Sequence, residues 1–394
     1  MKTDQIQKVH KDWYKLDLSA IVYPTLQRRD FSSVYRLSVL LKEDIDPEIL
    51  QRAVNLTMPR FPTYKAAIRK GVFWRYLEPN DRPGPFVQED VKNPCQPMHF
   101  KGNNRYLVRI YYYRNRIALE AHHSLGDGTG GMCVLQTLTA TYLRLKGHSE
   151  IENGGFVLDI LGIPDPGELE DAYMKYANAK VCPPRPGEKT YRVRGTKEPF
   201  YTLNIIDGIM SVSEVMRVAK SYNATITEYL NSVLLYALMQ KQESEWHLKL
   251  RPVKIAMPVN LRRFFPSRTL RNFITMIYPG IDPRLGEYTF EEIVTQVHNY
   301  MRYYLNEKLL RGDITTNAET QRNPFIRIVP LFIKDLVVRQ FYTKIQDKNS
   351  SAGLTNMGAL KVPETMKPYI ERFDIYMGQP FSTRTNCAIA SFED

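Results

Sequence analysis

A short stretch of this 394-residue chain, His-His-Ser-Leu-Gly-Asp-Gly at residues 122–128, holds the side chains best suited to chemistry. His122 and His123 are adjacent, and Asp127 lies four positions after the second histidine. Imidazole has the unperturbed pKa nearest to neutral pH, so a histidine here could take a proton from a hydroxyl or an amine. The stretch therefore predicts a general base.

Two other interpretations of the stretch stay open. Histidine and aspartate are common metal ligands, but neighbouring residues on an extended segment point to opposite faces, so His122 and His123 do not easily reach one ion. The remaining histidines and the cysteines show no ligand spacing, and we expect no metal. In the second interpretation, the stretch is a polar turn whose histidines are merely hydrogen-bonded.

The flanking residues predict a strand before the histidines and a helix after them. Residues 106–113 and 116–121 are typical of a hairpin that turns at Arg114 and Asn115. Beyond the motif, apolar residues recur at helical spacing: Val134, Leu135, Leu138, Tyr142 and Leu145. One histidine is then expected to point into a cleft and the other into the core.

Glycines separate the two predicted elements. Gly128, Gly130 and Gly131 have no side chain to block a close approach of backbone. They also place the N-terminus of the predicted helix beside the reacting centre, where its free amides could stabilise an oxyanion.

The pattern His-His-x-x-x-Asp-Gly resembles the signature of an acyltransferase superfamily. This superfamily includes chloramphenicol acetyltransferase, the condensation domains of peptide synthetases, and alcohol O-acetyltransferases. The chain is most similar to the free-standing bacterial alcohol O-acetyltransferase-like members. The resemblance implies that His123 is the general base, that His122 supports it, and that Gly128 completes the motif. It also implies that Asp127 is structural and pairs with an arginine of a second lobe.

Segments in the second half of the chain extend this resemblance. Pro-Val-Asn-Leu-Arg at residues 258–262 ends a predicted strand, and Thr-Asn-Met-Gly at residues 355–358 ends another. Arg-Asn-Phe at residues 271–273 occupies the position of the usual Gly-Asn-Phe, with arginine in place of glycine. We expect Arg262 to be the partner of Asp127, with Arg263 as the second choice.

Substrate contacts are expected near these landmarks. Arg263, Arg268 and Arg271 belong to a loop that the resemblance places near the lobe interface, and we expect them to meet the phosphates of a donor. Arg262 is expected at the substrate site as well. Asn356 is expected to contact substrate as well. The alternative is that the arginines form an exposed, solvated loop.

Charge and composition limit the partners. The formal charge of +12 would attract coenzyme A or an acidic acyl carrier protein, although a surplus of surface lysine and arginine explains it equally well. No nucleic-acid-binding motif accompanies the basic residues, so we expect no nucleic acid.

The chain has no apolar run long enough for a transmembrane segment and no apolar secretion signal. Four cysteines in so long a chain form no disulfide framework, so we expect a cytoplasmic protein. Cys133, near the motif, is expected to be a small buried residue of the helix and not a nucleophile.

Alternating strand and helix patterns predict an α/β fold, and the resemblance implies that it consists of two chloramphenicol-acetyltransferase-like lobes. Each lobe is expected to be a mostly mixed sheet covered by helices, with the active-site tunnel between them. We assign residues 1–180 to the first lobe and residues 181–394 to the second, since a Pro- and Gly-rich stretch follows the first lobe. Single helices are expected at residues 289–310 and 324–346. The predicted strand at residues 385–392 is normally followed in the family by a further strand and a helix, so we expect an unpaired sheet edge there.

The resemblance implies an acyl-CoA-dependent O-acyltransferase that uses a histidine base and forms no acyl-enzyme. The acyl group is expected to be acetyl, the acceptor an alcohol or an amine, and acyl-CoA or an acyl carrier thioester a co-substrate, with no bound cofactor. Two alternatives remain: a free-standing condensation enzyme of the nonribosomal peptide or polyketide type, and a catalytically idle condensation-like binding module.

Overall fold

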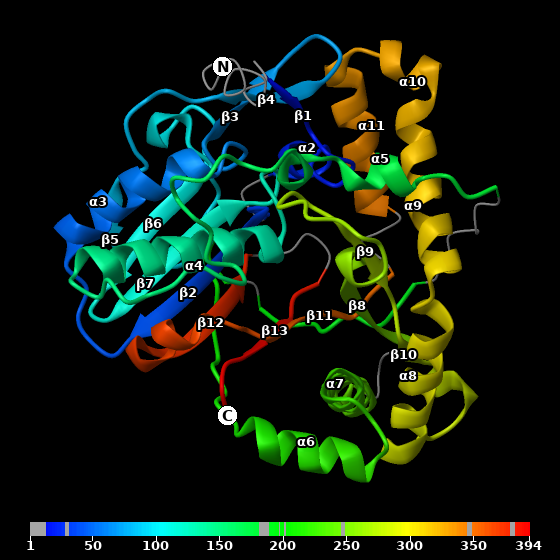
Figure 1. Ribbon diagram of the computed structural model, residues 1–394. Coiled ribbons are helices and arrows are strands. Elements are labelled where there is room, and N and C mark those ends of the chain that lie inside the picture. The colour runs from blue at the N-terminus through cyan, green and yellow to red at the C-terminus, as the bar shows by residue number, and fades with distance from the viewer. Residues whose placement is uncertain are drawn as a thin grey trace.

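The computed structural model describes residues 13–27, 31–180, 189–196, 198–200, 202–245, 249–344, 349–378 and 383–394. Sheets and surrounding helices build this part of the chain (Figure 1). The first sheet has the strand order β12-β2-β7-β6-β5. Its strands are β2 (Val34–Leu41), β5 (Val87–Glu89), β6 (Val108–Tyr113), β7 (Arg116–His122) and β12 (Ile370–Met377).

The hairpin before the histidine motif forms as the sequence predicted. β6 and β7 pair antiparallel, from Val108 opposite Ala121 to Tyr113 opposite Arg116. Arg114, at the turn, has a positive φ of 50°. β2 lies between β7 and β12, and every one of its residues is buried. The strand that leads to the histidines therefore runs through the middle of a sheet that is covered on both faces.

The second sheet is mixed. β8 and β13 run parallel to β11, whereas β9 and β10 pair antiparallel with β8. Its strands are β8 (Val253–Asn260), β9 (Ile274–Ile277), β10 (Gly280–Ile281), β11 (Ala352–Ala359) and β13 (Asn386–Ser391). Among the described residues β13 is the last strand in this order, at the edge that the sequence predicted to be unpaired.

A small third sheet lies at one end of the molecule, in the order β1-β4-β3 (Figure 1). Its strands are β1 (Tyr14–Lys15), β3 (Ala66–Lys70) and β4 (Arg75–Pro79). β3 and β4 form a hairpin, and residues 71–74 form its turn.

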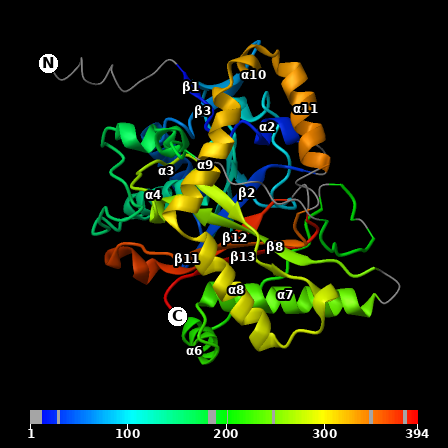
Figure 2. The ribbon, with the colours of Figure 1, turned by 90° about the vertical axis from the view of Figure 1, so that its right-hand side faces the viewer.

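Helices cover the two larger sheets. α3 (Pro47–Thr57) and α4 (Gly128–Leu145) pack on the first sheet, and α7 (Ile226–Ser244) and α8 (Phe290–Tyr304) pack on the second (Figure 2). α3 begins after Asp46, whose carboxylate accepts hydrogen bonds from the first free amides of the helix. The other helices are α2 (Tyr23–Leu26), α5 (Ala172–Tyr176), α6 (Val212–Ser221), α9 (Glu307–Arg322), α10 (Pro324–Ile328) and α11 (Leu331–Lys344).

One strand that follows the second sheet's β11 in the sequence, β12, belongs to the first sheet. β12 pairs antiparallel with β2, so a segment from near the end of the chain completes the first sheet. Leu360, Met366, Ile370 and Phe373 belong to the hydrophobic core of that lobe. The expected boundary at residue 180 therefore describes most of each lobe but assigns β12 to the wrong sheet. The strand was missed because its partner lies hundreds of residues away in the sequence.

Two helices expected to be continuous are broken. Residues 289–310 form α8 and the start of α9, which are separated by Leu305 and Asn306. Residues 324–344 form α10 and α11, with Pro330 between them, and the last two residues of the expected helix lie outside the described residues. Proline has no amide hydrogen to donate and disfavours a helical residue before it, and this explains the second break. Cys182, in the predicted crossover, lies outside the described residues.

No helix in the described ranges is long and apolar enough to cross a membrane.

Candidate active site

The histidine motif joins the end of β7 to the start of α4. β7 ends at His122, which lies opposite Val34 of β2. The next residue continues toward the same neighbouring strand, because the His123 amide donates a 2.9 Å hydrogen bond to the Ser33 carbonyl. Asp127 is the N-cap residue of α4. The motif is therefore held by a central strand on one side and a long buried helix on the other.

His122 points into the core and has no solvent exposure. Its Nδ1 accepts a 3.2 Å hydrogen bond from the Ser124 amide, so Nε2 carries the proton and donates to Gln27 Oε1 at 3.1 Å. Burial lowers the pKa of His122 to about 3, and the neighbouring His123 lowers it further. Both ring nitrogens are occupied, so His122 orders the turn and is not free to exchange a proton with substrate.

His123 lies between two tyrosines and keeps partial exposure. The Tyr23 ring of α2 stacks on it at 4.8 Å between centroids, and the Tyr35 ring of β2 lies at 4.6 Å on a tilt. Burial lowers the pKa of His123 to about 4, and the Asp127 carboxylate opposes this shift only in part. His123 is therefore neutral at physiological pH. Its Nδ1 has no hydrogen-bond partner among the described residues.

Asp127 ties the two lobes together. Its carboxylate accepts the amides of Thr129 and Gly130 at 3.1 and 3.2 Å, which caps α4. The same carboxylate forms an ion pair with Arg262, 2.8 Å from Nη1 to Oδ2, and accepts the Phe273 amide at 2.9 Å. Arg262 follows β8 of the second sheet, as the sequence predicted for the partner. Its guanidinium also donates to the Thr269 carbonyl at 2.9 Å, so it binds the protein itself, not a ligand.

The N-terminus of α4 is less available to an oxyanion than the sequence suggested. The Asp127 carboxylate already accepts two of its amides, those of Thr129 and Gly130. Gly130 instead allows a close approach of backbone, because a Cβ there would collide with the Leu270 carbonyl oxygen. Gly126 meets the same carbonyl. The glycines therefore serve the lobe contact. A Cβ on Gly128 would lie 2.9 Å from the Met357 sulfur of β11.

Asn272 contacts His123 from the second lobe. Its Nδ2 donates to the His123 carbonyl at 2.8 Å and to the Asp17 carboxylate at 3.1 Å. Asn272 is buried. The segment Arg-Asn-Phe was recognisable in the sequence, but no role was predicted for Asn272. Tyr23 and Tyr35 were also missed, because only the folded chain brings their rings against His123.

The arginines expected at the substrate site are not equivalent. Arg271 is buried and its Nε lies 3.6 Å from the Asp17 carboxylate, so it presents no charge to a ligand. Arg268 is exposed and pairs with Asp165 at 3.0 Å. Arg263 is exposed, and its Nη2 lies 3.6 Å from the position of a Cβ on Gly358. The structure therefore separates the expected cluster and leaves Arg263 beside the Thr-Asn-Met-Gly segment.

A cavity of about 2270 Å³ lies between the second sheet, α6, α7 and β12. Asn356 and Gly358 line it, and Asn356 is held by a 3.0 Å hydrogen bond to Thr227. Neither His123 nor the two tyrosines against its ring, Tyr23 and Tyr35, are among the lining residues. The described part of the chain contains no cluster of histidine, cysteine and carboxylate side chains that could hold a metal ion.

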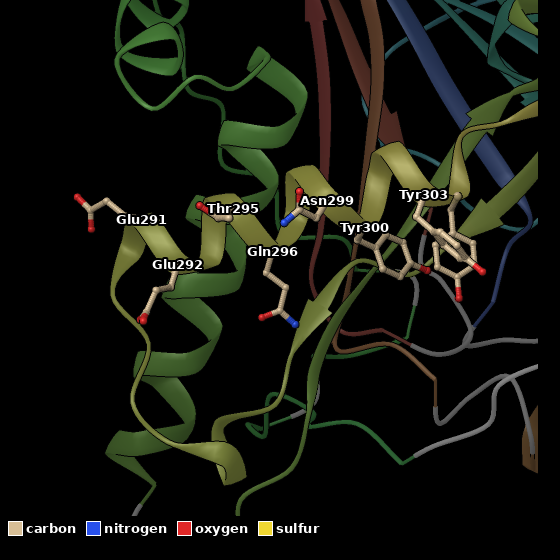
Figure 3. Close-up of a pocket in the computed structure, with 8 residues that line it drawn as sticks. Glu291, Glu292, Thr295, Gln296, Asn299, Tyr300 and Tyr303 are labelled. Carbon is tan, nitrogen blue, oxygen red and sulfur yellow. The ribbon is translucent and has the colours of Figure 1, made fainter.

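A second hollow, of about 600 Å³, runs along α8 (Figure 3). The labelled side chains, among them Glu291, Gln296 and Tyr300, are spread along one helix and do not converge on a point. It contains no residue of the histidine motif. This hollow is not a candidate for the chemistry.

Cys133 can also be set aside as a nucleophile. It is buried in α4, and its Sγ donates to the Phe156 carbonyl at 3.2 Å. Burial raises the pKa of Cys133 to about 12, so the thiol stays protonated.

No protein-family model matches this chain, and no curated protein matches it. Solved structures do match. Polyketide synthase associated protein 5 from Mycobacterium tuberculosis aligns with a TM-score of 0.57 and 13% identity, over 95% of this chain and 90% of that one. Trichothecene 15-O-acetyltransferase TRI3 from Fusarium sporotrichioides aligns with a TM-score of 0.58 and 12% identity, over 96% and 88%.

The starter condensation domain of rhizomide synthetase RzmA, solved with C8-CoA and Leu-SNAC, aligns with a TM-score of 0.59 and 11% identity. The alignment covers 99% of this chain and 87% of that one. At such identities the likeness shows the fold alone. The chain therefore has the two-lobe fold of chloramphenicol-acetyltransferase-like and condensation proteins, and the predicted fold class is confirmed. Its closeness to bacterial alcohol O-acetyltransferases stays a prediction.

Proposed function

We propose that the protein is an acyltransferase that moves an acyl group from acyl-CoA to an alcohol or amine acceptor, with His123 as general base. The observation that carries the proposal is a neutral, partly exposed histidine that residues of both lobes hold at the lobe junction. The fold supports it, since matching structures include an O-acetyltransferase and a condensation domain solved with C8-CoA.

The proposed reaction needs one base and no covalent enzyme intermediate. The acceptor hydroxyl gives its proton to neutral His123 while its oxygen bonds to the thioester carbonyl carbon. The tetrahedral intermediate then collapses, and the carbon–sulfur bond breaks. The thiolate leaves and takes the proton from the imidazolium, which restores His123. The products are an ester and free coenzyme A.

The neighbours of His123 would position it for this step. Asn272 fixes the backbone carbonyl of His123 at 2.8 Å, and the Ser33 carbonyl fixes its amide at 2.9 Å. The Tyr23 ring restricts rotation of the imidazole by stacking on it. Substrate must displace part of this aromatic cover, since Tyr23 and Tyr35 now occupy two sides of the ring.

Cationic side chains of the large cavity are available to bind the phosphates of the donor. Exposed cationic residues at the rim of the large cavity include Arg194, Lys249 and Arg251. Carboxylates such as Glu198 and Asp374 also line the cavity, so the cations raise the local concentration of an anionic donor at their own end of it. We favour an acetyl group, an alcohol acceptor and a CoA donor over a carrier-bound donor, as the sequence analysis did.

The test is release of free thiol from a panel of acyl-CoAs in the presence of simple alcohols and amines. We expect acceptor-dependent thiol release, and we expect His123→Ala to lower kcat by about 10²–10⁴ because a positioned base contributes that much. His148→Ala is the matched control, since His148 lies outside the motif and stacks on Tyr369. It should keep the wild-type rate.

Each remaining result separates the alternatives. Thiol release only from an acyl carrier protein would indicate a condensation enzyme. No thiol release from any donor would indicate an idle binding module. Near-normal turnover by a folded His123→Ala variant would remove His123 from the role of base.

A further inference from the structure

Two segments far apart in the sequence meet at one end of the molecule. One is the β3–β4 turn at residues 71–74, and the other is the α10–α11 pair, which lies beside it (Figures 1 and 2). The Leu331 amide donates to the Val72 carbonyl at 2.8 Å, and Lys334 Nζ donates to the Phe73 carbonyl at 2.9 Å. These contacts make the turn and the helices one continuous surface.

Large apolar side chains are exposed across this surface. Phe325 is 77% exposed, Phe332 74% and Val72 69%, and Trp74, Ile328 and Leu336 are each more than half exposed. We call these six residues the apolar ridge. Exposed apolar residues scattered singly are ordinary, whereas a contiguous group marks a contact site.

α11 is turned the opposite way from an ordinary surface helix. Its acidic residue faces the protein: Asp335 forms a partly buried ion pair with Arg75 at 2.6 Å and accepts the Thr25 hydroxyl at 2.9 Å. Phe332 and Leu336, one turn apart, face outward. A surface helix normally buries its apolar stripe and exposes its charges. The contacts of Asp335 with Arg75 and Thr25 therefore hold α11 with its apolar side chains facing outward.

The charges around the apolar ridge are positive. Lys70 and Arg327 are exposed at its border, and Lys334 lies between the two segments. The carboxylate of Asp335 is already paired with Arg75. With the chain at +12 overall, this end of the molecule favours an anionic partner.

We propose that the apolar ridge docks the protein on an anionic phospholipid bilayer. Phe325, Phe332 and Leu336 enter the boundary between headgroups and acyl chains, and Trp74 lies at headgroup level, where tryptophan is favoured. Lys70 and Arg327 meet the lipid phosphates. A second copy is a poorer occupant, because a twofold contact would bring the cations of both ridges together.

The experiment measures flotation of the full chain with vesicles. One set is pure phosphatidylcholine, and the other is equimolar phosphatidylcholine and phosphatidylglycerol. We expect binding to the second set and much weaker binding to the first. Phe332→Ser should weaken binding to the anionic vesicles by about tenfold, since it removes one large buried side chain from the contact. Trp74→Ser should act in the same direction.

Charge variants and matched controls complete the design. Lys70→Glu and Arg327→Glu should weaken binding to anionic vesicles, with an effect that shrinks as salt rises. Leu161→Ser and Leu285→Ser are the controls, because these leucines are 88% and 80% exposed outside the apolar ridge. They should bind like the wild type. Thermal melts check that every variant is folded.

Three results would overturn the proposal. The first is that the wild-type chain does not float with vesicles. The second is that Phe332→Ser and Lys70→Glu both float as well as the wild type. The third is a dimer, seen by analytical ultracentrifugation, that Phe332→Ser dissociates while vesicles bind nothing, which would assign the apolar ridge to a second copy. None of these readouts depends on acyl transfer, so the docking and the proposed function fail separately.

Discussion

His123 gains its availability as a base from burial. The tyrosine cover removes solvent from the imidazolium form, and this lowers the pKa of His123 to about 4. At neutral pH almost all of the protein then holds the base in its unprotonated form. The cost is a weaker base, since proton affinity falls with the pKa. The carboxylate of Asp127 reduces the shift without cancelling it.

The pH dependence of turnover follows from this shift. A base is lost when it is protonated, so the rate should fall as pH drops through the pKa of His123, about 4, and not near the ordinary value of histidine, about 6.5. We expect kcat/KM to stay level between pH 8 and about 5.5 on this acid limb. Initial rates in buffers of constant ionic strength measure it. An acid limb centred near 6.5 would show that His123 is solvated in the working enzyme.

At the scale of elements, the sequence predicted the frame of the site well. β6, β7 and α4 have local signals: alternation, a turn, and helical spacing after a glycine cluster. The pairing of Asp127 with Arg262 could also be foreseen, because the resemblance implies an arginine partner from the second lobe and Arg262 follows a recognisable strand. The contacts of Tyr23 and Asn272 with His123 could not be, since they depend on how distant segments pack.

Long-range pairing also explains the missed strand. β12 reads Ile-Glu-Arg-Phe-Asp-Ile-Tyr-Met, whose charges interrupt the apolar alternation that marks a half-buried strand. Its pairing with β2 supplies the backbone partners that the local pattern does not reveal. The burial of Phe373 in the first core then fixes its register.

The ion pair between Asp127 and Arg262 should matter for stability. Asp127→Asn keeps the shape of the side chain but leaves the mostly buried guanidinium of Arg262 unpaired, which costs about 3–5 kcal/mol. We expect a clear fall in Tm together with a lower rate, measured by calorimetry and thiol release.

Asp165→Asn is the matched control for that variant. Asp165 pairs with Arg268 at 3.0 Å, but both side chains are well exposed, so the change should cost about 1 kcal/mol or less. An Asp127→Asn variant with the Tm of the wild type and no turnover would assign Asp127 a direct catalytic role.

At the scale of the whole molecule, the lobes form one unit. β12 enters the first sheet, Arg262 and Asn272 reach the motif from the second lobe, and α11 is anchored to α2 through Asp335 and Thr25. α2 in turn carries Tyr23, which stacks on His123. The surface that we assign to the bilayer is therefore connected through α2 to the proposed catalytic histidine.

We expect the positive charge of Arg263 to help bind the phosphates of the acyl-CoA donor. Arg263 is exposed beside Gly358 of the large cavity, whereas Arg268 is paired with Asp165 and Arg271 is buried. We expect Arg263→Glu to raise KM for acyl-CoA by about tenfold at low salt, with kcat little changed, because it removes binding shared by ground and transition states.

Two comparisons test the assignment of Arg263: the salt dependence of KM, and the same charge reversal at Arg268 and Arg271. The KM effect of Arg263→Glu should shrink as salt rises, since the Debye length falls to about 8 Å at physiological ionic strength. Arg268→Glu should leave KM nearly unchanged, because Asp165 already neutralises that arginine. Arg271→Glu should instead lower Tm, since it sets two buried carboxylates, its own and that of Asp17, against each other. If Arg263→Glu has the wild-type KM at low salt, the donor phosphates bind elsewhere, and the basic rim at Arg194 and Arg251 becomes the next site to reverse.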